Sequence, residues 1–191
     1  MYDRRDKADP NHGVYEYKFY FNTIFHETYS CHRRPSQCRQ IHAFQSDDRR
    51  GGYGQGRLLG GNLATLCHLL GTAQQPQTEG CILFLEDTAE PLYKIDRMLT
   101  HLACAGLFNK LNGLIIGLFD LGHDDRLETL RLNEQVWQRV LELCAAGNFP
   151  VWGGFPVGHQ ERNMALPVGM EAVMHSASGS LEFLPQRCRR L

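Results

Sequence analysis

The sequence predicts an α/β protein, a compact mixed-sheet domain preceded by an N-terminal segment of atypical composition that we expect to be poorly structured. Two observations carry this prediction. From Leu58 onward, apolar runs of strand length alternate with amphipathic helical stripes, the pattern of strands joined by crossover helices. Residues 1–50 contain nine Tyr and Phe and sixteen charged residues but only four aliphatic side chains larger than alanine. Such a segment has little with which to build a core.

Two continuous apolar runs predict strands that are buried on both faces. These runs are residues 81–85 and 114–119. A short third strand is predicted at 150–152, and a closing hairpin at 171–174 and 181–184. Near the N-terminus, the partly alternating run at 14–21 is strand-like, whereas residues 31–56 are poor in apolar side chains and predict a loop.

Three helices are predicted between the strands. The first covers residues 63–70, with Asn62 as its N-cap and Gly71 as its terminator. The second has Pro91 in its first turn and ends at Gly106, and the third runs from residue 127 to 144 before Gly147. We therefore expect three parts: an atypical aromatic and basic segment at 1–55, the folded domain at 56–185 and a tail at 186–191.

Composition and charge exclude several classes of function. Twenty basic and 21 acidic residues give a net charge of −1, which argues against nucleic acid and anionic membranes as partners. No apolar run reaches the roughly 18 residues of a membrane span, and no signal peptide is evident, so we expect a cytoplasmic protein. The seven cysteines form no CxxC pair and fit free thiols in a reducing compartment.

The cysteines and histidines of the N-terminal segment have two interpretations, a zinc site or scattered thiols and imidazoles. The four potential zinc ligands would be Cys31, His32, Cys38 and His42. Their spacing is not the paired pattern of zinc modules, so the interpretation without a metal is favoured. The basic clusters at 33–34, 49–50 and 187–190 are interpreted as solvated surface. We therefore predict neither a metal nor a cofactor.

Polar residues that directly follow apolar runs are the candidate site, because functional groups gather at strand ends in such sheets. Glu86 follows the run at 81–85, and His159 lies in a glycine-rich loop after the strand at 150–152. If the two converge, the carboxylate can orient the imidazole as a general base for a nucleophile. The alternatives are that Glu86 caps the next helix and that His159 is a solvated side chain in a tight turn.

Several motifs in register resemble the C-terminal domain of the LD-carboxypeptidase family, the muramoyltetrapeptide carboxypeptidases and microcin C self-immunity peptidases. The resemblance spans residues 56–175, about two-thirds of the chain. The motifs are GRLLGGNL at 56–63, ILFLED at 82–87 with Glu90, IDRML at 95–99, Ala105-Gly106, GFPVGH at 154–159 and LPVG at 166–169.

The resemblance implies a serine peptidase that removes the terminal D-alanine from a cytoplasmic murein tetrapeptide during peptidoglycan recycling. Its Ser-Glu-His triad would use His159 as the general base and Glu86 as the orienting carboxylate. The motif residues Gly60, Gly61 and Asn62 would contact the substrate. The family is free of metals and typically homodimeric, with the active site between two domains, so we expect a homodimer or self-association.

The nucleophilic serine departs from the family pattern. In the family it lies in a Gly-x-Ser-Asp segment of an N-terminal domain of more than a hundred residues, whereas here 59 residues precede Gly60. The run RGGYG at 50–54 resembles a family turn but lies next to the GGNL motif. Ser46-Asp47 imitates the nucleophile pair without the strand-turn-helix context that would expose a serine. The other serines, Ser30, Ser36, Ser176, Ser178 and Ser180, have no better context.

Two hypotheses follow. The first is a serine-type LD-carboxypeptidase of which this chain supplies only the Glu and His, as a truncated or frame-shifted fragment that is weak or inactive alone. The second is a remnant without catalytic activity that binds muropeptide or pairs with another subunit. A cysteine nucleophile ranks third, because Cys67 and Cys81 lie within apolar elements and are interpreted as core.

Overall fold

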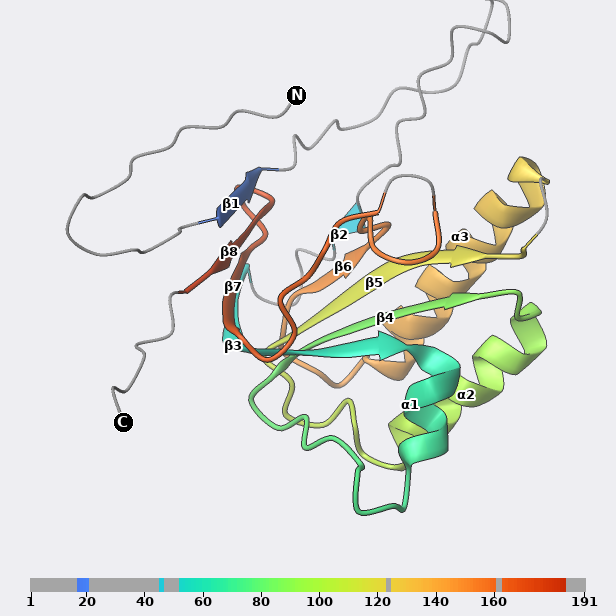
Figure 1. The fold of residues 1–191 in the computed structure, drawn as a ribbon, viewed down its shortest axis with the longest axis horizontal. Coiled ribbons are helices and arrows are strands. Elements are labelled where there is room, and N and C mark those ends of the chain that lie inside the picture. The colour runs from blue at the N-terminus through green and yellow to red at the C-terminus, as the bar shows by residue number, and fades with distance from the viewer. Residues whose placement is uncertain (1–16, 21–44, 47–51, 123–124, 161–162, 185–191) are drawn as a thin grey trace, which may run out of the picture.

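In the part of the chain that the computed structural model describes, three helices pack against one curled sheet (Figure 1). The structure describes residues 17–20, 45–46, 52–122, 125–160 and 163–184, and the side chains from residue 52 onward within these ranges. The cysteine and histidine cluster at 31–42, Ser30, Ser36, the side chain of Ser46 and the tail at 186–191 lie outside this description.

The sheet has the order β1-β8-β7-β3-β4-β5-β6-β2. Its strands are β1 (Tyr17–Tyr20), β2 (Gln45–Ser46), β3 (Tyr53–Asn62), β4 (Ile82–Thr88), β5 (Gly113–Asp120), β6 (Val151–Gly153), β7 (Glu171–His175) and β8 (Ser180–Phe183). Strands β3, β4, β5 and β6 are parallel to one another, whereas β1, β7, β8 and β2 join in antiparallel pairs. The mixed α/β sheet predicted from the sequence is confirmed.

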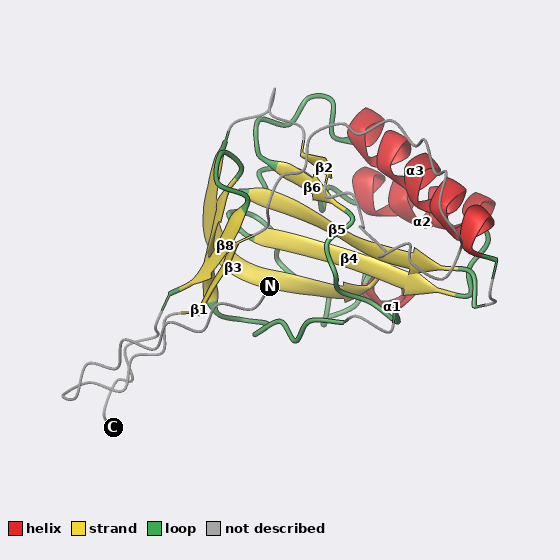
Figure 2. Ribbon diagram, turned by 90° about the horizontal axis from the view of Figure 1, so that it is seen from above, coloured by secondary structure: helices red, strands yellow, loops and turns green. Residues whose placement is uncertain are grey.

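The long strand β3 is shared by two halves of the sheet. Its first half, Tyr53 to Arg57, pairs antiparallel with β7, and its second half, Leu58 to Asn62, pairs parallel with β4. The sheet curls at this strand, so that β7 and β8 stand at one end of the parallel strands (Figure 2). The loop predicted for residues 31–56 is therefore wrong at 45–46 and 53–56, and the expected domain boundary after residue 55 falls inside β3.

Three helices lie against one face of the parallel strands (Figures 1 and 2). They are α1 (Leu63–Leu69), α2 (Leu92–Cys104) and α3 (Arg126–Leu143), close to the predicted ranges. Asn62 caps α1 by accepting a hydrogen bond from the Thr65 amide, as predicted. The helical face and the strand residues beneath it, including Leu83, Leu85 and Leu114, form one buried cluster. No helix in the described part of the chain is long and apolar enough to cross a membrane.

A second buried cluster fills the inside of the curl. It joins the opposite faces of β4 and β5 to the hairpin β7–β8 and to the loop after β6, through residues such as Phe84, Ile115 and Phe155. Because successive residues of a strand point to opposite faces, Glu86 shares this face with Ile82 and Phe84, whereas Asp87 faces the helices. Both faces of the parallel strands are thus covered, which explains their continuous apolar sequences.

Candidate functional site

The carboxyl ends of β3, β4 and β5 lie at one edge of the sheet. Asn62, the last residue of β3, is in register with Glu86 of β4, so parallel pairing places the GGNL and ILFLED motifs side by side at this edge. The sequence predicted that strand β4 ends at residue 85. The strand instead extends to Thr88, so Glu86 and Asp87 lie within the strand and not in the loop after it. A side chain within a paired strand has a better defined direction than one in a loop.

An irregularity in β5 makes room for Glu86. Leu85 is in register with Ile116 and Asp87 with Phe119, so two residues of β5, Gly117 and Leu118, lie opposite Glu86 alone. Bulges of this kind redirect side chains beside functional sites. A Cβ atom on Gly117 would lie 3.1 Å from Cβ of Glu86 and 2.5 Å from the Val157 carbonyl oxygen. Glycine at this position permits the approach of both neighbours.

The loop that carries His159 is attached to the same irregular part of β5. The Phe155 amide donates to the Ile116 carbonyl at 3.1 Å, and the Leu118 amide donates to the Val157 carbonyl at 2.9 Å. Phe155 is fully buried and stacks on Trp152. Gly158 has φ +138°, and a Cβ there would meet the Leu118 carbonyl oxygen at 2.7 Å. The backbone before His159 is therefore held close to β5.

These two elements bring Glu86 and His159 together. Nδ1 of His159 lies 2.8 Å from Oε2 of Glu86, although the residues are 73 positions apart in the sequence. The Glu86 side chain is 9% exposed, whereas that of His159 is 50% exposed. Since an ionised carboxylate only accepts hydrogen bonds, Nδ1 carries the proton and Nε2 is the accepting nitrogen of the neutral ring. The arrangement is a general base with its orienting carboxylate.

The alternative that Glu86 caps the next helix is wrong, because no side chain caps α2, whereas the neighbouring carboxylate of Asp87 bonds to the preceding helix α1. Asp87, which is 3% exposed, accepts hydrogen bonds from the amides of Ala64 and Thr88 and from Nδ2 of Asn62. It thereby caps α1. Helix α2, the next helix along the chain, has Pro91 at its N-cap position and no side-chain cap. Glu86 therefore remains available to His159.

The three residues predicted to contact the substrate lie at this edge in different environments. A Cβ on Gly60 would lie 2.0 Å from the Phe84 carbonyl oxygen, so Gly60 permits close strand packing, whereas Gly61 borders open space. The amide group of Asn62 is used within the protein, because Oδ1 accepts from Thr65 and Nδ2 donates to Asp87. Asn62 therefore fixes the junction between β3 and α1.

The serine hydroxyl groups that the structure describes bond to partners other than His159, and the thiols of Cys67 and Cys81 are partly or fully buried. Oγ of Ser176 accepts from the Trp152 indole, and the hydroxyl groups of Ser178 and Ser180 bond to each other. Burial raises the pKa of the Cys67 thiol to about 11, and the charge of Asp87 adds to this effect. A thiol with a raised pKa is a poor nucleophile at neutral pH. Cys81 is buried, which agrees with its interpretation as core.

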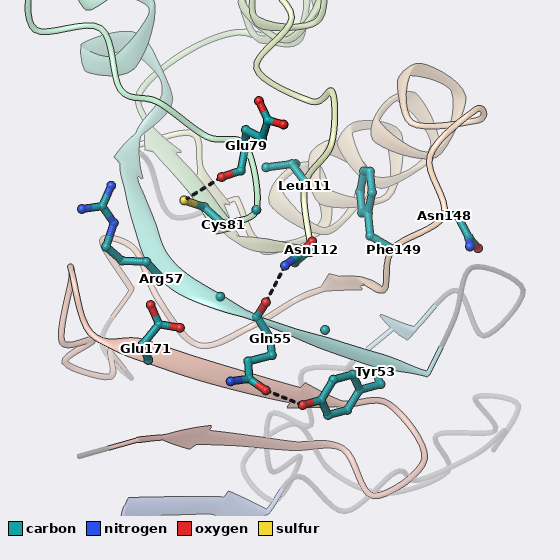
Figure 3. A pocket seen from close by; sticks show the side chains of 13 residues that line it. Tyr53, Gln55, Arg57, Glu79, Cys81, Leu111, Asn112, Asn148, Phe149 and Glu171 are labelled. Atoms are coloured by element: carbon teal, nitrogen blue, oxygen red, sulfur yellow. Dashed lines mark hydrogen bonds between the residues drawn. The ribbon is translucent and has the colours of Figure 1, made fainter. Parts of the chain in front are cut away.

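A depression of about 830 Å³ lies at the opposite ends of the strands (Figure 3). Its lining includes Arg57, Glu79 and Phe149, and Nδ2 of Asn112 donates to the Gln55 carbonyl in its floor. Glu79 precedes β4 and Asn112 precedes β5, so the depression is at the amino edge and Glu86 at the carboxyl edge.

Among the described residues, no group of three or more His, Cys, Asp or Glu side chains is placed to hold a metal ion.

Two residues near the site escaped the sequence analysis. Asp120 ends β5 and accepts a hydrogen bond from Nε2 of Gln160, the residue after His159. Asn163 accepts from the Gly158 amide on the other side of the histidine. A signal for Asp120 was present, since it directly follows the apolar run at 114–119 just as Glu86 follows its own run. The partners Gln160 and Asn163 have no such sequence signal.

Comparison with protein families identifies the domain. Residues 55–174 match the model of the LD-carboxypeptidase C-terminal domain, well over half of the chain. The chain belongs to the LD-carboxypeptidase family. Glu86 and His159 both fall within the matched residues.

Relatives of this LD-carboxypeptidase domain include enzymes named for murein peptides. The chain is 34% identical over 121 residues to the murein tetrapeptide carboxypeptidase of Pseudomonas aeruginosa, covering 63% of this chain and 38% of that protein. It is 30% identical over 121 residues to the microcin C7 self-immunity protein MccF of Escherichia coli, covering 61% and 33%. The chain thus spans less than half the length of these relatives.

Solved structures agree with the fold of the LD-carboxypeptidase domain. The muramoyltetrapeptide carboxypeptidase of Oxalobacter formigenes superposes with a TM-score of 0.59 at 25% identity, over 92% of this chain and 51% of that chain. MccF in complex with glutamyl sulfamoyl guanosine also gives a TM-score of 0.59, at 27% identity, over 71% of this chain and 39% of that chain. The mixed α/β architecture is therefore shared with these structures.

Proposed function

We propose that this chain supplies the Glu-His pair of a serine-type LD-carboxypeptidase that hydrolyses the bond to the terminal D-alanine of murein tetrapeptides. The observation that carries the proposal is the 2.8 Å contact between Nδ1 of His159 and Oε2 of Glu86. It leaves Nε2, the accepting nitrogen, on a half-exposed ring. The relatives named murein tetrapeptide carboxypeptidase and muramoyltetrapeptide carboxypeptidase support the choice of substrate class.

The proposed chemistry is acyl transfer. Nε2 of His159 takes the proton of a serine hydroxyl as the serine oxygen attacks the carbonyl carbon of the scissile bond, and Glu86 stabilises the imidazolium that forms. The imidazolium then protonates the leaving amine of D-alanine, which leaves an acyl-enzyme. A water molecule, deprotonated by the same nitrogen, attacks the acyl carbon. The imidazolium then returns that proton to the serine oxygen as the acyl bond breaks, which releases the shortened peptide and the serine.

We place the nucleophilic serine outside the residues whose side chains the structure describes. The three serines with described side chains lie on the β7–β8 hairpin, with Oγ of Ser176 bonded to Trp152 and Ser178 bonded to Ser180. A triad that lacks one member loses on the order of 10⁴- to 10⁶-fold in rate. We therefore expect the isolated chain to be a weak peptidase or an inactive one, acting in the cytoplasm where its substrate would be found.

The test measures D-alanine released from murein tetrapeptide by the purified chain. Release that falls more than a hundredfold in His159→Ala and Glu86→Gln, but not in the exposed control His101→Ala, supports the proposal. Release that is unchanged in His159→Ala contradicts it. Labelling with a serine-directed phosphonate, followed by peptide mapping, identifies the nucleophile.

The second candidate is binding of muropeptide without catalysis, and the open space beside Gly61 at the same edge favours it. Calorimetric titration with tetrapeptide separates the candidates. Binding that persists in His159→Ala, with neither D-alanine release nor phosphonate label, supports the second candidate. Absence of binding contradicts the second candidate.

We also propose that the chain self-associates. Three large apolar side chains are exposed on the helices, namely Tyr93 at 60%, Leu127 at 68% and Leu130 at 48%. Exposed apolar surface favours association. Light scattering that reports a monomer at high concentration would contradict this proposal.

A further inference from the structure

His159 lies in a part of the chain that has no regular secondary structure. Residues 158–160 form bends between the short strand β6 and the strand β7. A half-exposed imidazole that is tied down by one hydrogen bond to Glu86 can rotate away from it unless its backbone is fixed. The residues on both sides of His159 are therefore expected to carry anchoring contacts.

Side-chain hydrogen bonds hold both flanks of His159. Before the histidine, the Gly158 amide donates to Oδ1 of Asn163 at 3.3 Å. After it, Nε2 of Gln160 donates to Oδ2 of Asp120 at 3.3 Å, across 40 positions of sequence. Of these two side-chain contacts, the second reaches a different element, because Asp120 is the last residue of β5, and it adds to the backbone hydrogen bonds that attach the loop to this strand before the histidine.

Asp120 also contacts the two other loops at this edge of the sheet. Its Oδ1 accepts a hydrogen bond from the Gly122 amide at 2.8 Å, which shapes the turn after β5. Its backbone carbonyl accepts from the Ala89 amide at 2.7 Å, in the turn after β4, the strand that carries Glu86. One residue thus links the turns after β4 and β5 to the loop after β6.

We propose that Asp120 is a positioning residue, which acts through Gln160 to keep Nδ1 of His159 within hydrogen-bond distance of Glu86. The inference deepens the proposed function, in which His159 is the base. Asp120 and Gln160 need not touch the substrate. Their effect is to reduce the conformations available to the histidine before any substrate binds.

The test follows the ring nitrogens of His159 by ¹⁵N NMR in the full chain, without substrate. Gln160→Met keeps the length of the side chain but removes the donor, whereas Gln160→Lys supplies a new donor to Asp120. We expect the ratio of the Nδ1–H to the Nε2–H form to fall about fivefold in Gln160→Met, the effect of one net hydrogen bond. Gln160→Lys should restore most of this ratio.

Gln135→Met, the same substitution at an exposed site on α3, is the matched control and should leave the His159 signals unchanged. An unchanged ratio in Gln160→Met would overturn the proposal. So would a ratio that falls equally in Gln160→Met and Gln160→Lys, because the effect would then not depend on a donor to Asp120. The experiment needs no turnover, so D-alanine release that is unchanged in His159→Ala would contradict the proposed function and leave this result independent of it.

Discussion

Gly158 permits the contact between the histidine loop and β5, and its replacement by alanine tests that role. Its φ of +138° is a conformation that residues with a side chain rarely adopt, at a cost of about 1–3 kcal/mol. In addition, the new Cβ would lie 2.7 Å from the Leu118 carbonyl oxygen and 3.4 Å from Oε2 of Glu86. Relief of such an overlap typically costs another 1–3 kcal/mol or so.

Gly61→Ala is the matched control for this substitution. Gly61 has φ +151°, so it bears a similar backbone cost, but nothing lies within 4 Å of the Cβ that alanine would add. We expect Gly61→Ala to lower the free energy of unfolding by about 1–3 kcal/mol and Gly158→Ala by about 2–6 kcal/mol. The difference between the two variants measures the overlap alone.

The assay combines urea unfolding with the ¹⁵N spectrum of His159. Gly158→Ala should be the less stable variant and should also lose the Nδ1–H signature of the bond to Glu86, because the loop must move away from β5 to relieve the overlap. Gly61→Ala should retain that signature. Equal destabilisation by the two substitutions, or an intact His159 signature in Gly158→Ala, would refute the reasoning.

Three further predictions concern the surroundings of the site. Asp87→Ala removes the acceptor of three hydrogen bonds, including that of the Ala64 amide. Urea unfolding should show that the free energy of unfolding falls by about 2–4 kcal/mol, and a loss below about 1 kcal/mol would contradict the structure. At pH 8, mass spectrometry should find Cys67 alkylated at least about tenfold more slowly than the exposed Cys104, because burial raises the pKa of Cys67 to about 11, and the scarcity of its thiolate outweighs the greater nucleophilicity of that thiolate. Comparable rates at pH 8 would argue against this environment. Phe155→Ala should cost about 3–5 kcal/mol, since the ring is fully buried at the start of the histidine loop, and a near-native unfolding midpoint would show that the loop is anchored otherwise.

Most helices and strands from residue 63 onward were predictable, because their signals are local. The Asn62 cap, the apolar stripe of α2 and the continuous apolar runs of β4 and β5 each specify an element through neighbours in the sequence. The end of β4 was placed too early, since Glu86 and Asp87 are polar. They remain in the strand because Glu86 is in register with Asn62 of β3, and Asp87 is in register with Phe119 of β5.

The first half of β3 was predicted as a loop because residues 31–56 contain few apolar side chains. Gly54 and Gly56 are nevertheless strand residues, and a Cβ on either would lie within about 2 Å of a carbonyl oxygen of Asn112 or Gly80. Glycine is needed there so that the chain segments before β4 and β5 can approach the strand. The apolar content of a segment is a property of its own residues and contains no information on such approaches.

The sequence by itself determined the alternation of strands and helices, the family motifs and the two polar residues at strand ends, because apolar periodicity, caps and motifs are properties of neighbouring residues. Only the tertiary structure decided that Glu86 contacts His159 and that Asp120 holds Gln160. These contacts depend on the register of β4 against β5, on the extra residue opposite Glu86 and on a glycine that lets the loop approach. The two contacts join residues that are 73 and 40 positions apart, so they are set by packing between distant segments and not by the sequence neighbours of Glu86, His159, Asp120 or Gln160.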